Sequence, residues 1–313
     1  MPHPPVKRDL LSVADLADDL LPLLARAAEM KAARRRGDLS ATRGGTNVAM
    51  IFEKPSTRTR TSFEVAMNDL GGHALYLAPK DMQLGRGETI ADTARVLSRY
   101  VDAIVYRAFR HEDMTELAKW ASVPVINALD DREHPCQIVA DLLTLHERWE
   151  GAFRGKRLAF IGDGNNVLAS LLLGCALVGL DLTAATPADY RPAPDLVATA
   201  EAIARAKGGH LAFTDDPTTA AEGADALYTD VWVSMGDEAE AEARRAAFRG
   251  FQINADLVAR ARPGVWVLHD LPAHRGEEIT DEVIDGPRSV VWDQAENRLH
   301  AQKAILERLV PGR

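Results

Sequence analysis

The fold is decided by residues 47–64, which read NVAMIFEKPSTRTRTSFE. The apolar run 47–52 predicts a buried strand, because short apolar runs bounded by turn signals are typical of covered parallel sheets. Pro55 and the hydroxyl residues after it are a favourable helix start. The apolar spacing that follows continues the helix as far as Gly71, a residue type that often ends helices. The stretch therefore predicts a strand, a tight turn and a helix.

The start of this helix is a predicted anion site. Unpaired backbone N–H groups and the helix dipole favour negative charge at a helix N-terminus. Arg58 and Arg60 add guanidinium groups whose geometry suits phosphate oxygens. The bland alternative is a capped helix with two solvated arginines. Three hydroxyl residues and two arginines directly after a strand favour a phosphate site instead.

The composition restricts the class of protein. The chain has 313 residues and a formal charge of -9. Its length suggests two domains of roughly 150 residues each, and its charge argues against a general nucleic-acid binder. Cys136 and Cys175 make no disulfide framework and fit a reducing cytoplasm. No apolar run approaches the roughly 18 residues of a membrane span. We expect a cytoplasmic α/β enzyme that binds neither nucleic acid nor membrane.

Strand and helix patterns alternate along both halves of the chain, which is typical of parallel sheets with crossover helices. Residues 12–36 are predicted to form one long helix or a kinked pair, with Pro22 at the kink or boundary. A bridging helix is expected near 136–149 and a terminal helix at 294–309. Strands are expected at 46–52, 74–77, 103–106, 124–127, 157–161, 181–185, 211–214, 226–229 and 265–269, and further helices at 57–70, 89–100 and 113–121.

These patterns predict an α/β fold with two domains, each a parallel sheet flanked by helices, joined by bridging helices. The first domain is expected at 1–135, with the C-terminal helix 294–313 packed back on it, and the second at 150–290. Ligands of open parallel sheets bind beyond the carboxyl ends of the strands. Five polar clusters fall at such ends, and we expect the site there: Arg107, His134 with Gln137, Asn165 with Asn166, Asp230 with Ser234, and His269 with Asp270.

Three alternative chemistries are poorly supported. The loop 162–166 contains G-x-G, but position 167 is Val where a dinucleotide loop needs its third glycine, so a tight turn presenting an asparagine amide is favoured. His269 and Asp270 lack a third metal ligand at a sensible spacing. No G-x-S-x-G elbow is present for a catalytic serine. We expect neither a cofactor nor a metal.

Five motifs carry a resemblance to a known family: residues 52–60 (FEKPSTRTR), 83–88 (QLGRGE), 134–137 (HPCQ), 230–236 (DVWVSMG) and 296–298 (ENR). With them the chain resembles ornithine carbamoyltransferases and, more broadly, the aspartate/ornithine carbamoyltransferase superfamily. The similarity runs from about residue 7 to about residue 310. The Ser-Thr-Arg-Thr-Arg run marks the superfamily, and DVWVSMG marks its ornithine branch.

The resemblance implies transfer of the carbamoyl group of carbamoyl phosphate to the side-chain amine of L-ornithine, giving citrulline for arginine biosynthesis. It also implies a homotrimer with shared active sites, in which Gln83 reaches a neighbouring subunit. The implied carbamoyl-phosphate residues are Ser56, Thr57, Arg58, Thr59, Gln83, Arg107, His134, Gln137, Leu271 and Arg298. The implied ornithine residues are Asn166, Asp230, Ser234 and Met235. The candidate catalytic residues are Arg107, His134 and Arg298, together with Asp270, where the chain departs from the family.

The chain departs from the family pattern at Asp270, where the family has cysteine before Leu-Pro. An aspartate there either holds the acceptor amine as an ammonium ion or takes its proton as a base. Three alternatives therefore remain: an ornithine carbamoyltransferase that tolerates the substitution at position 270, a carbamoyltransferase for a different amine, or a non-catalytic relative. Intact residues Arg58, Arg107 and His134 argue against the non-catalytic relative.

Overall fold

The computed structural model describes residues 7–39, 41–84, 86–234, 236 and 238–312. The chain divides into two compact units: unit 1 comprises Met1–Leu143 and Arg298–Arg313, and unit 2 comprises Thr144–Asn297. The chain passes from one unit to the other inside two helices, α5 (Pro135–Arg148) and α12 (Val291–Leu309). Within the part of the chain that the structure describes, we find no helix both long enough and apolar enough to cross a membrane.

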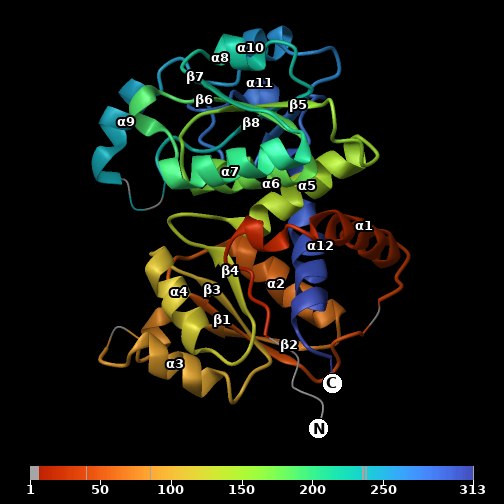
Figure 1. Cartoon of the computed structure of the whole chain (residues 1–313), viewed down its shortest axis with the longest axis vertical. Coiled ribbons are helices and arrows are strands. Elements are labelled where there is room, and N and C mark those ends of the chain that lie inside the picture. The colour runs from red at the N-terminus through yellow and green to blue at the C-terminus, as the bar shows by residue number, and fades with distance from the viewer. Residues whose placement is uncertain (1–6, 40, 85, 235, 237, 313) are drawn as a thin grey trace. The chain divides into compact units, whose positions relative to one another are not determined.

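Unit 1 is built on a four-stranded parallel sheet in the order β2-β1-β3-β4. Helices α3 (Ile90–Leu97) and α4 (His111–Trp120) pack on one face of the sheet, and α2 (Thr57–Asp69) and α12 lie on the other (Figure 1). Strands β1, β3 and β4 are buried and read as near-continuous apolar runs, whereas the edge strand β2 is partly exposed. The strands are β1 (Asn47–Phe52), β2 (His73–Leu77), β3 (Ala103–Arg107) and β4 (Val125–Leu129).

The register of this sheet fixes where its functional side chains lie. Phe52, the last residue of β1, pairs with Arg107, the last residue of β3. Both strands therefore end at the same edge of the sheet. Ser56 follows β1 after a short turn and caps α2, so the helix start and Arg107 are brought to that edge together.

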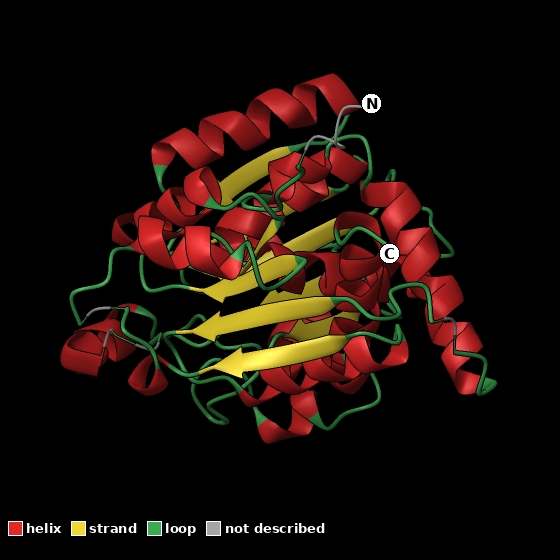
Figure 2. Cartoon of the chain, turned by 90° about the horizontal axis from the view of Figure 1, so that it is seen from below, coloured by secondary structure: helices red, strands yellow, loops and turns green. Residues whose placement is uncertain are grey.

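Unit 2 is built on a five-stranded parallel sheet in the order β7-β6-β5-β8-β9. Helices α6 (Asn166–Val178) and α7 (Pro194–Lys207) lie on one face, and α8 (Pro217–Ala221), α10 (Ala255–Arg260) and α11 (Asp281–Ile284) contribute to the apolar cluster on the other (Figure 1). Figure 2 shows the parallel strands as yellow arrows with red helices on either side. The strands are β5 (Arg157–Ile161), β6 (Asp181–Ala185), β7 (Leu211–Thr214), β8 (Ala226–Thr229) and β9 (Trp266–His269), and a further helix is α9 (Ala241–Ala247).

All nine predicted strands are found within about two residues of their expected bounds, and the fold class is confirmed. Of the two alternatives expected over 12–36, one long helix or a kinked pair, the structure has two separate elements: a short 3-10 helix, η1 (Val13–Leu16), and α1 (Leu20–Arg35). Pro22 is the third residue of α1, where its missing N–H needs no intrahelical partner, so it marks a helix start and no kink. The remaining 3-10 helices are η2 (Pro79–Asp81), η3 (Ala188–Tyr190) and η4 (Glu238–Glu240).

Candidate active site

The N-terminus of α2 has the geometry expected of an anion site. Ser56 is extended and its Oγ accepts a hydrogen bond from the backbone N–H of Thr59 at 3.3 Å. No acidic side chain stands in the first turn to compete with an anion. Ser56 and Arg58 are half-buried and Thr57 is exposed, so the helix start remains accessible. The helix dipole and the remaining N–H groups of the first turn favour a phosphate here.

Arg60 does not take part, contrary to the expectation that both arginines of this stretch serve the anion. Its Nε pairs with Glu64 at 2.9 Å, and its guanidinium lies over the ring of Tyr76 at 3.7 Å from the centroid. Two residues apart on a helix, Arg58 and Arg60 point about 200° apart, so both cannot face the same ligand. The sequence pattern predicted two arginines at the anion site, and of these two only Arg58 can face the ligand.

Arg298 connects the buried polar groups of unit 1. Its Nη2 donates to Oγ1 of Thr59 at 2.8 Å, and its Nη1 donates to Oε1 of Gln137. Gln137 in turn donates from Nε2 to Asp141 at 2.8 Å. These four side chains are almost fully buried. Because Thr59 Oγ1 accepts from Arg298, its own hydroxyl hydrogen remains available to donate to a ligand.

His134 lies in a strongly cationic environment. It precedes α5 and is buried, as is Arg107 at the end of β3. Burial lowers the pKa of His134 well below its ordinary value, and the charges of Arg298, Arg107 and Arg58 lower it further. The imidazole is therefore neutral at physiological pH and keeps one N–H to donate. The three arginines that depress this pKa come from α12, β3 and α2, so the structure brings these predicted residues together.

Gln83 stands apart from this cluster. Its side chain is exposed, and in the described part of the chain it forms no hydrogen bond with the residues above. That arrangement is compatible with the expected reach of Gln83 into a neighbouring subunit, which stays a prediction.

The glycine-rich turn after β5, residues 162–164, packs closely against another part of the chain. A Cβ on Gly164 would lie 2.2 Å from the carbonyl oxygen of Tyr190 and 2.5 Å from the nitrogen of Pro192. The second glycine is therefore required by the approach of the loop after β6, which occupies the space next to it. Asp163 in the same turn pairs with Arg244 at 2.8 Å. The turn is a tight structural one, in line with the interpretation that disfavoured a dinucleotide.

Asn165 orients the carboxylate of Asp230. Asn165 is the N-cap of α6, and its Oδ1 accepts from the N–H groups of Val167 and Leu168. Its Nδ2 donates to Asp230 Oδ2 at 2.7 Å, while Oδ1 of Asp230 accepts from the N–H of Val231 at 2.7 Å. Asp230 is only 5% exposed. These two donated hydrogen bonds fix the orientation of the Asp230 carboxyl group. Asn166, the predicted ligand, is the first residue of the helix and half-buried.

His269 is fixed by its neighbours in one tautomer. Leu271 donates its backbone N–H to Nδ1 of His269 at 2.9 Å, so Nδ1 carries a lone pair. The ring proton is therefore on Nε2, which lies 2.9 Å from Oε1 of Glu278. His269 and Glu278 are both fully buried. Leu271 has a φ of 62°, a left-handed conformation unfavourable for leucine, and its bond to His269 helps to hold it. His269 positions the backbone of Leu271.

Asp270 lies beside Asp230 in unit 2. One ligand-type atom from each of Asp230, His269 and Asp270 lies within 4.8 Å of the other two. The fold thus supplies the third metal-ligand type that sequence spacing did not reveal. Both Asp230 oxygens and Nδ1 of His269 already accept hydrogen bonds from the chain, so we infer no metal there. Ser234 is half-buried, and the predicted residue Met235 lies outside the described residues.

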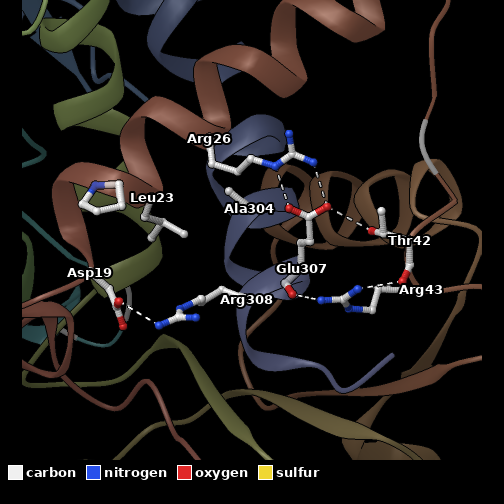
Figure 3. Close-up of a pocket in the computed structure, with 9 residues that line it drawn as sticks. Asp19, Leu23, Arg26, Thr42, Arg43, Ala304, Glu307 and Arg308 are labelled. Carbon is white, nitrogen blue, oxygen red and sulfur yellow. Dashed lines mark hydrogen bonds and ion pairs between the residues drawn. The ribbon is translucent and has the colours of Figure 1, made fainter. Parts of the chain in front are cut away.

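A separate pocket of about 600 Å³ lies between α1 and α12 in unit 1 (Figure 3). Arg26 forms a bidentate pair with Glu307, with distances of 2.7 and 2.9 Å, and this pair lowers the pKa of Glu307. Arg308 pairs with Asp19 at 2.8 Å, and Arg43 donates to the backbone oxygen of Glu307. The arginines of this pocket are thus engaged with the chain, and the pocket contains none of the predicted site residues.

Two supporting residues, Asp141 and Glu278, were missed in the sequence, and the partner of a third, Asn165, was not predicted. Asp141 is four residues after Gln137 on α5, a spacing that places both on one helix face and could have suggested it. Asn165 was noted at a strand end but not assigned a partner. Glu278 is nine residues from His269, and no local pattern links the two.

Two family models match the chain. The carbamoyl-P binding domain of aspartate/ornithine carbamoyltransferase matches residues 8–147, and the Asp/Orn binding domain of the same family matches residues 154–309. The second match includes residues 298–309 of α12, although these residues belong to compact unit 1 in the structure. Together the models cover nearly the whole chain. The chain belongs to the aspartate/ornithine carbamoyltransferase family.

Within that family, the chain is similar over nearly its full length to ornithine carbamoyltransferases. The protein from Methanoculleus marisnigri is 54% identical over 98% of both chains. The anabolic enzyme of Pyrococcus furiosus is 54% identical over 97% of both chains, and a solved structure of ornithine carbamoyltransferase from that organism matches with a TM-score of 0.93 over 97% of both chains. The catabolic enzyme of Thermoplasma volcanium is 51% identical over 97% of this chain and 99% of its own.

Proposed function

We propose that this chain is an ornithine carbamoyltransferase, which transfers the carbamoyl group of carbamoyl phosphate to the side-chain amine of L-ornithine to give L-citrulline and phosphate. The observation that carries the proposal is the convergence of Thr59, Gln137 and Arg298 beside His134 at the capped start of α2. The full-length similarity to ornithine carbamoyltransferases supports it. In this proposal unit 1 binds carbamoyl phosphate and unit 2 binds ornithine.

Carbamoyl phosphate is a small dianion that needs several donors at once. Its phosphate is held by Ser56, Thr57 and Thr59 with the N–H groups of the first turn of α2, and by the charges of Arg58 and Arg107. Arg298 adds a third cation and, like Arg107, is buried. Bidentate guanidinium contacts and a helix terminus together suit a terminal phosphate.

The carbamoyl group is polarised by neutral donors and a cation. The N–H of the neutral His134 imidazole, the hydroxyl of Thr59 and the guanidinium of Arg107 donate to the carbonyl oxygen. Negative charge develops on this oxygen as the amine attacks, and each such donor contributes about 2.7–4 kcal/mol to the transition state. The carbamoyl NH2 donates to Oε1 of Gln137 and to the backbone oxygen of Leu271.

Ornithine binds through the fixed polar groups of unit 2. The carboxylate of Asp230, held by Asn165, accepts the α-ammonium, and Asn166, Ser234 and the backbone of Met235 meet the α-carboxylate region. Asp270 contacts the side-chain amine, which must lose a proton to react. Holding the two substrates at once contributes further to the rate enhancement. Phosphate leaves as the C–N bond forms, and no covalent enzyme intermediate is required.

The assembly and setting are also proposals. The exposed side chain of Gln83 supports a homotrimer in which this residue completes a neighbour's site. The two buried cysteine thiols support a reducing cytoplasmic setting. An acyl phosphate is a higher-energy donor than the ureido product, so the favoured direction is citrulline formation, as in arginine biosynthesis.

The test is an acceptor panel with purified full-length protein. Phosphate release from carbamoyl phosphate is measured with L-ornithine, L-aspartate, L-lysine or putrescine as the single acceptor, and citrulline is assayed as the product of ornithine. The proposal expects ornithine to have the highest kcat/KM. A higher value for another amine would assign the enzyme to that acceptor. Binding of a phosphonate analogue without turnover of any acceptor would assign a non-catalytic role. Light scattering and gel filtration of the same sample test the trimer.

A further inference from the structure

We propose that unit 2 contains a binding site for a divalent transition-metal ion of the zinc class, formed by His274, Glu277 and Glu278. These residues lie on the loop between β9 and α11. None of them contacts a substrate in the proposed reaction, and Glu278 also holds His269 through its Oε1. One ring nitrogen of His274 and one carboxylate oxygen of each glutamate lie within 4.8 Å of one another. The proposal does not depend on the proposed function.

The two carboxylates have an unused oxygen each. Glu277 Oε1 accepts from Nε of Arg245 at 2.9 Å, and Glu278 Oε1 accepts from the backbone N–H of His274 at 2.6 Å and from His269. Oε2 of Glu277 and Oε2 of Glu278 are buried and accept no hydrogen bond from the described residues. Glu278 is completely buried. A buried, unsatisfied carboxylate oxygen is costly, and two such oxygens in adjacent residues favour a bound cation.

The backbone of the loop is held in place around the three side chains. The N–H of Glu277 donates to the carbonyl of His274 at 2.8 Å, and the N–H of Gly276 donates to the carbonyl of Ile279 at 2.9 Å. Gln252 donates from Nε2 to the carbonyls of Gly276 and Glu277. The ligand backbone is therefore preorganised, and only side-chain rotation is needed to complete the site.

The geometry requires a small closure. Nδ1 of His274 lies 3.9 Å from Oε2 of Glu277. Neighbouring ligands of a tetrahedral zinc ion, with bonds of about 2.0–2.2 Å, lie about 3.3 Å apart. The ring of His274 is 43% exposed and can turn toward the carboxylates. One imidazole and two carboxylates suit zinc, cobalt or a similar ion, whereas magnesium and calcium prefer an all-oxygen shell. Water would complete the coordination from the exposed side.

The experiment uses full-length protein stripped with EDTA and titrated with Zn²⁺ by calorimetry and with Co²⁺ by visible absorption. The expected result is one ion per chain, a tetrahedral cobalt spectrum and a Tm that rises with Zn²⁺. His274→Gln and Glu277→Gln should each weaken binding by about 10- to 100-fold or more. His210→Gln and Glu282→Gln, exposed positions in the same unit, are the matched controls and should bind as the parent does. Circular dichroism verifies that every variant is folded.

Three results would overturn the proposal. The first is no binding of Zn²⁺ or Co²⁺ by the parent protein. The second is unchanged affinity in both His274→Gln and Glu277→Gln. The third is loss of binding in Asp270→Asn while the His274 variant still binds, which would assign the ion to Asp230, His269 and Asp270.

Discussion

Arg298 donates a hydrogen bond from Nη2 to Oγ1 of Thr59 at 2.8 Å, although 239 positions separate the two residues in the chain. The same guanidinium donates to Gln137. A planar fork can meet two acceptors at once, which an ammonium cannot do in the same geometry. Arg298 thus ties the start of α2 to α5 within unit 1 and fixes the orientation of two groups proposed to contact carbamoyl phosphate.

Replacement of Arg298 by lysine should reduce kcat/KM for carbamoyl phosphate by about 100- to 1,000-fold, the loss typical of one misplaced transition-state donor. The charge is retained, but the fork that orients Thr59 and Gln137 is lost. Initial rates of citrulline formation at varied carbamoyl phosphate measure the effect. Arg308→Lys is the control, since Arg308 lies on the same helix in an exposed pair with Asp19. Equal activity of the two variants would rule out a positioning role for Arg298.

Replacement of Asp270 by cysteine should give the ornithine kinetics expected of family members that have cysteine at this position. In the parent, Asp230 and Asp270 place two carboxylates within 4.8 Å, which favours the ammonium form of an acceptor amine. Removing one opposite charge should lower the pKa of the bound amine by about 1 unit or more. The pH at which kcat, measured at saturating ornithine, reaches its plateau should fall by the same amount, because kcat reports the groups of the bound complex. Asp270→Asn should show the same shift if charge is the cause. An unchanged rate, acceptor profile and pH profile in Asp270→Cys would remove Asp270 from the mechanism.

The Asp69–Lys303 pair should be important for the stability of unit 1. Nζ of Lys303 lies 3.1 Å from Asp69, and both side chains are more than nine-tenths buried. Asp69→Asn would leave the ammonium of Lys303 buried without its charge partner, at a cost of about 3–5 kcal/mol. Urea unfolding measures the difference. Asp92→Asn breaks the exposed pair with Arg95 and should cost less than about 1 kcal/mol. Comparable losses for the two variants would contradict the role of burial.

The strands were predictable because their signal is local. β1 and β3 are apolar runs with polar residues at their carboxyl ends, so the edge that holds Ser56 and Arg107 follows from the sequence alone. Helix periodicity also predicts that Arg58 and Arg60 point in different directions, which their residue type alone does not show. The tertiary contacts could not be predicted in the same way. Glu278 hydrogen-bonds His269, and Asn165 hydrogen-bonds Asp230. Both pairings depend on side-chain rotamers and on the paths of loops. Hydrogen bonds between residues that are distant in the chain produce no periodic pattern in the sequence.

Both cysteines should be unreactive in the folded protein. Cys136 and Cys175 are fully buried, and Sγ of Cys136 donates to the carbonyl of Asn127 at 3.3 Å. Burial raises the pKa of Cys136 to about 12, so the thiolate that attacks disulfide reagents is scarce even at pH 9. A colorimetric disulfide reagent should detect no thiol in native protein and two per chain in guanidinium chloride. Rapid modification of one thiol at pH 7 in native protein would show that this region opens.

The pH dependence of stability should reveal the buried state of His134. Burial and the charges of Arg298, Arg107 and Arg58 hold the pKa of His134 well below its ordinary value of 6.5. Below pH 6.5 the unfolded chain binds a proton that the folded chain refuses, so the stability falls as pH falls, by at most about 1.4 kcal/mol per pH unit. Above pH 6.5 neither state binds that proton and the contribution is constant.

The measurement is the free energy of unfolding of the parent and of His134→Gln between pH 8 and pH 5. Subtracting the two curves cancels the other titrating groups, including His111, whose pKa is raised by Asp130 and whose effect has the opposite sign. The difference should be flat above pH 7 and should move in favour of the variant below pH 6.5. His210→Gln, an exposed substitution, should give no such slope. A flat difference for His134→Gln down to pH 5 would mean that the folded protein accepts this proton as readily as the unfolded chain, and the neutral donor proposed for the carbamoyl oxygen would be lost at mildly acidic pH.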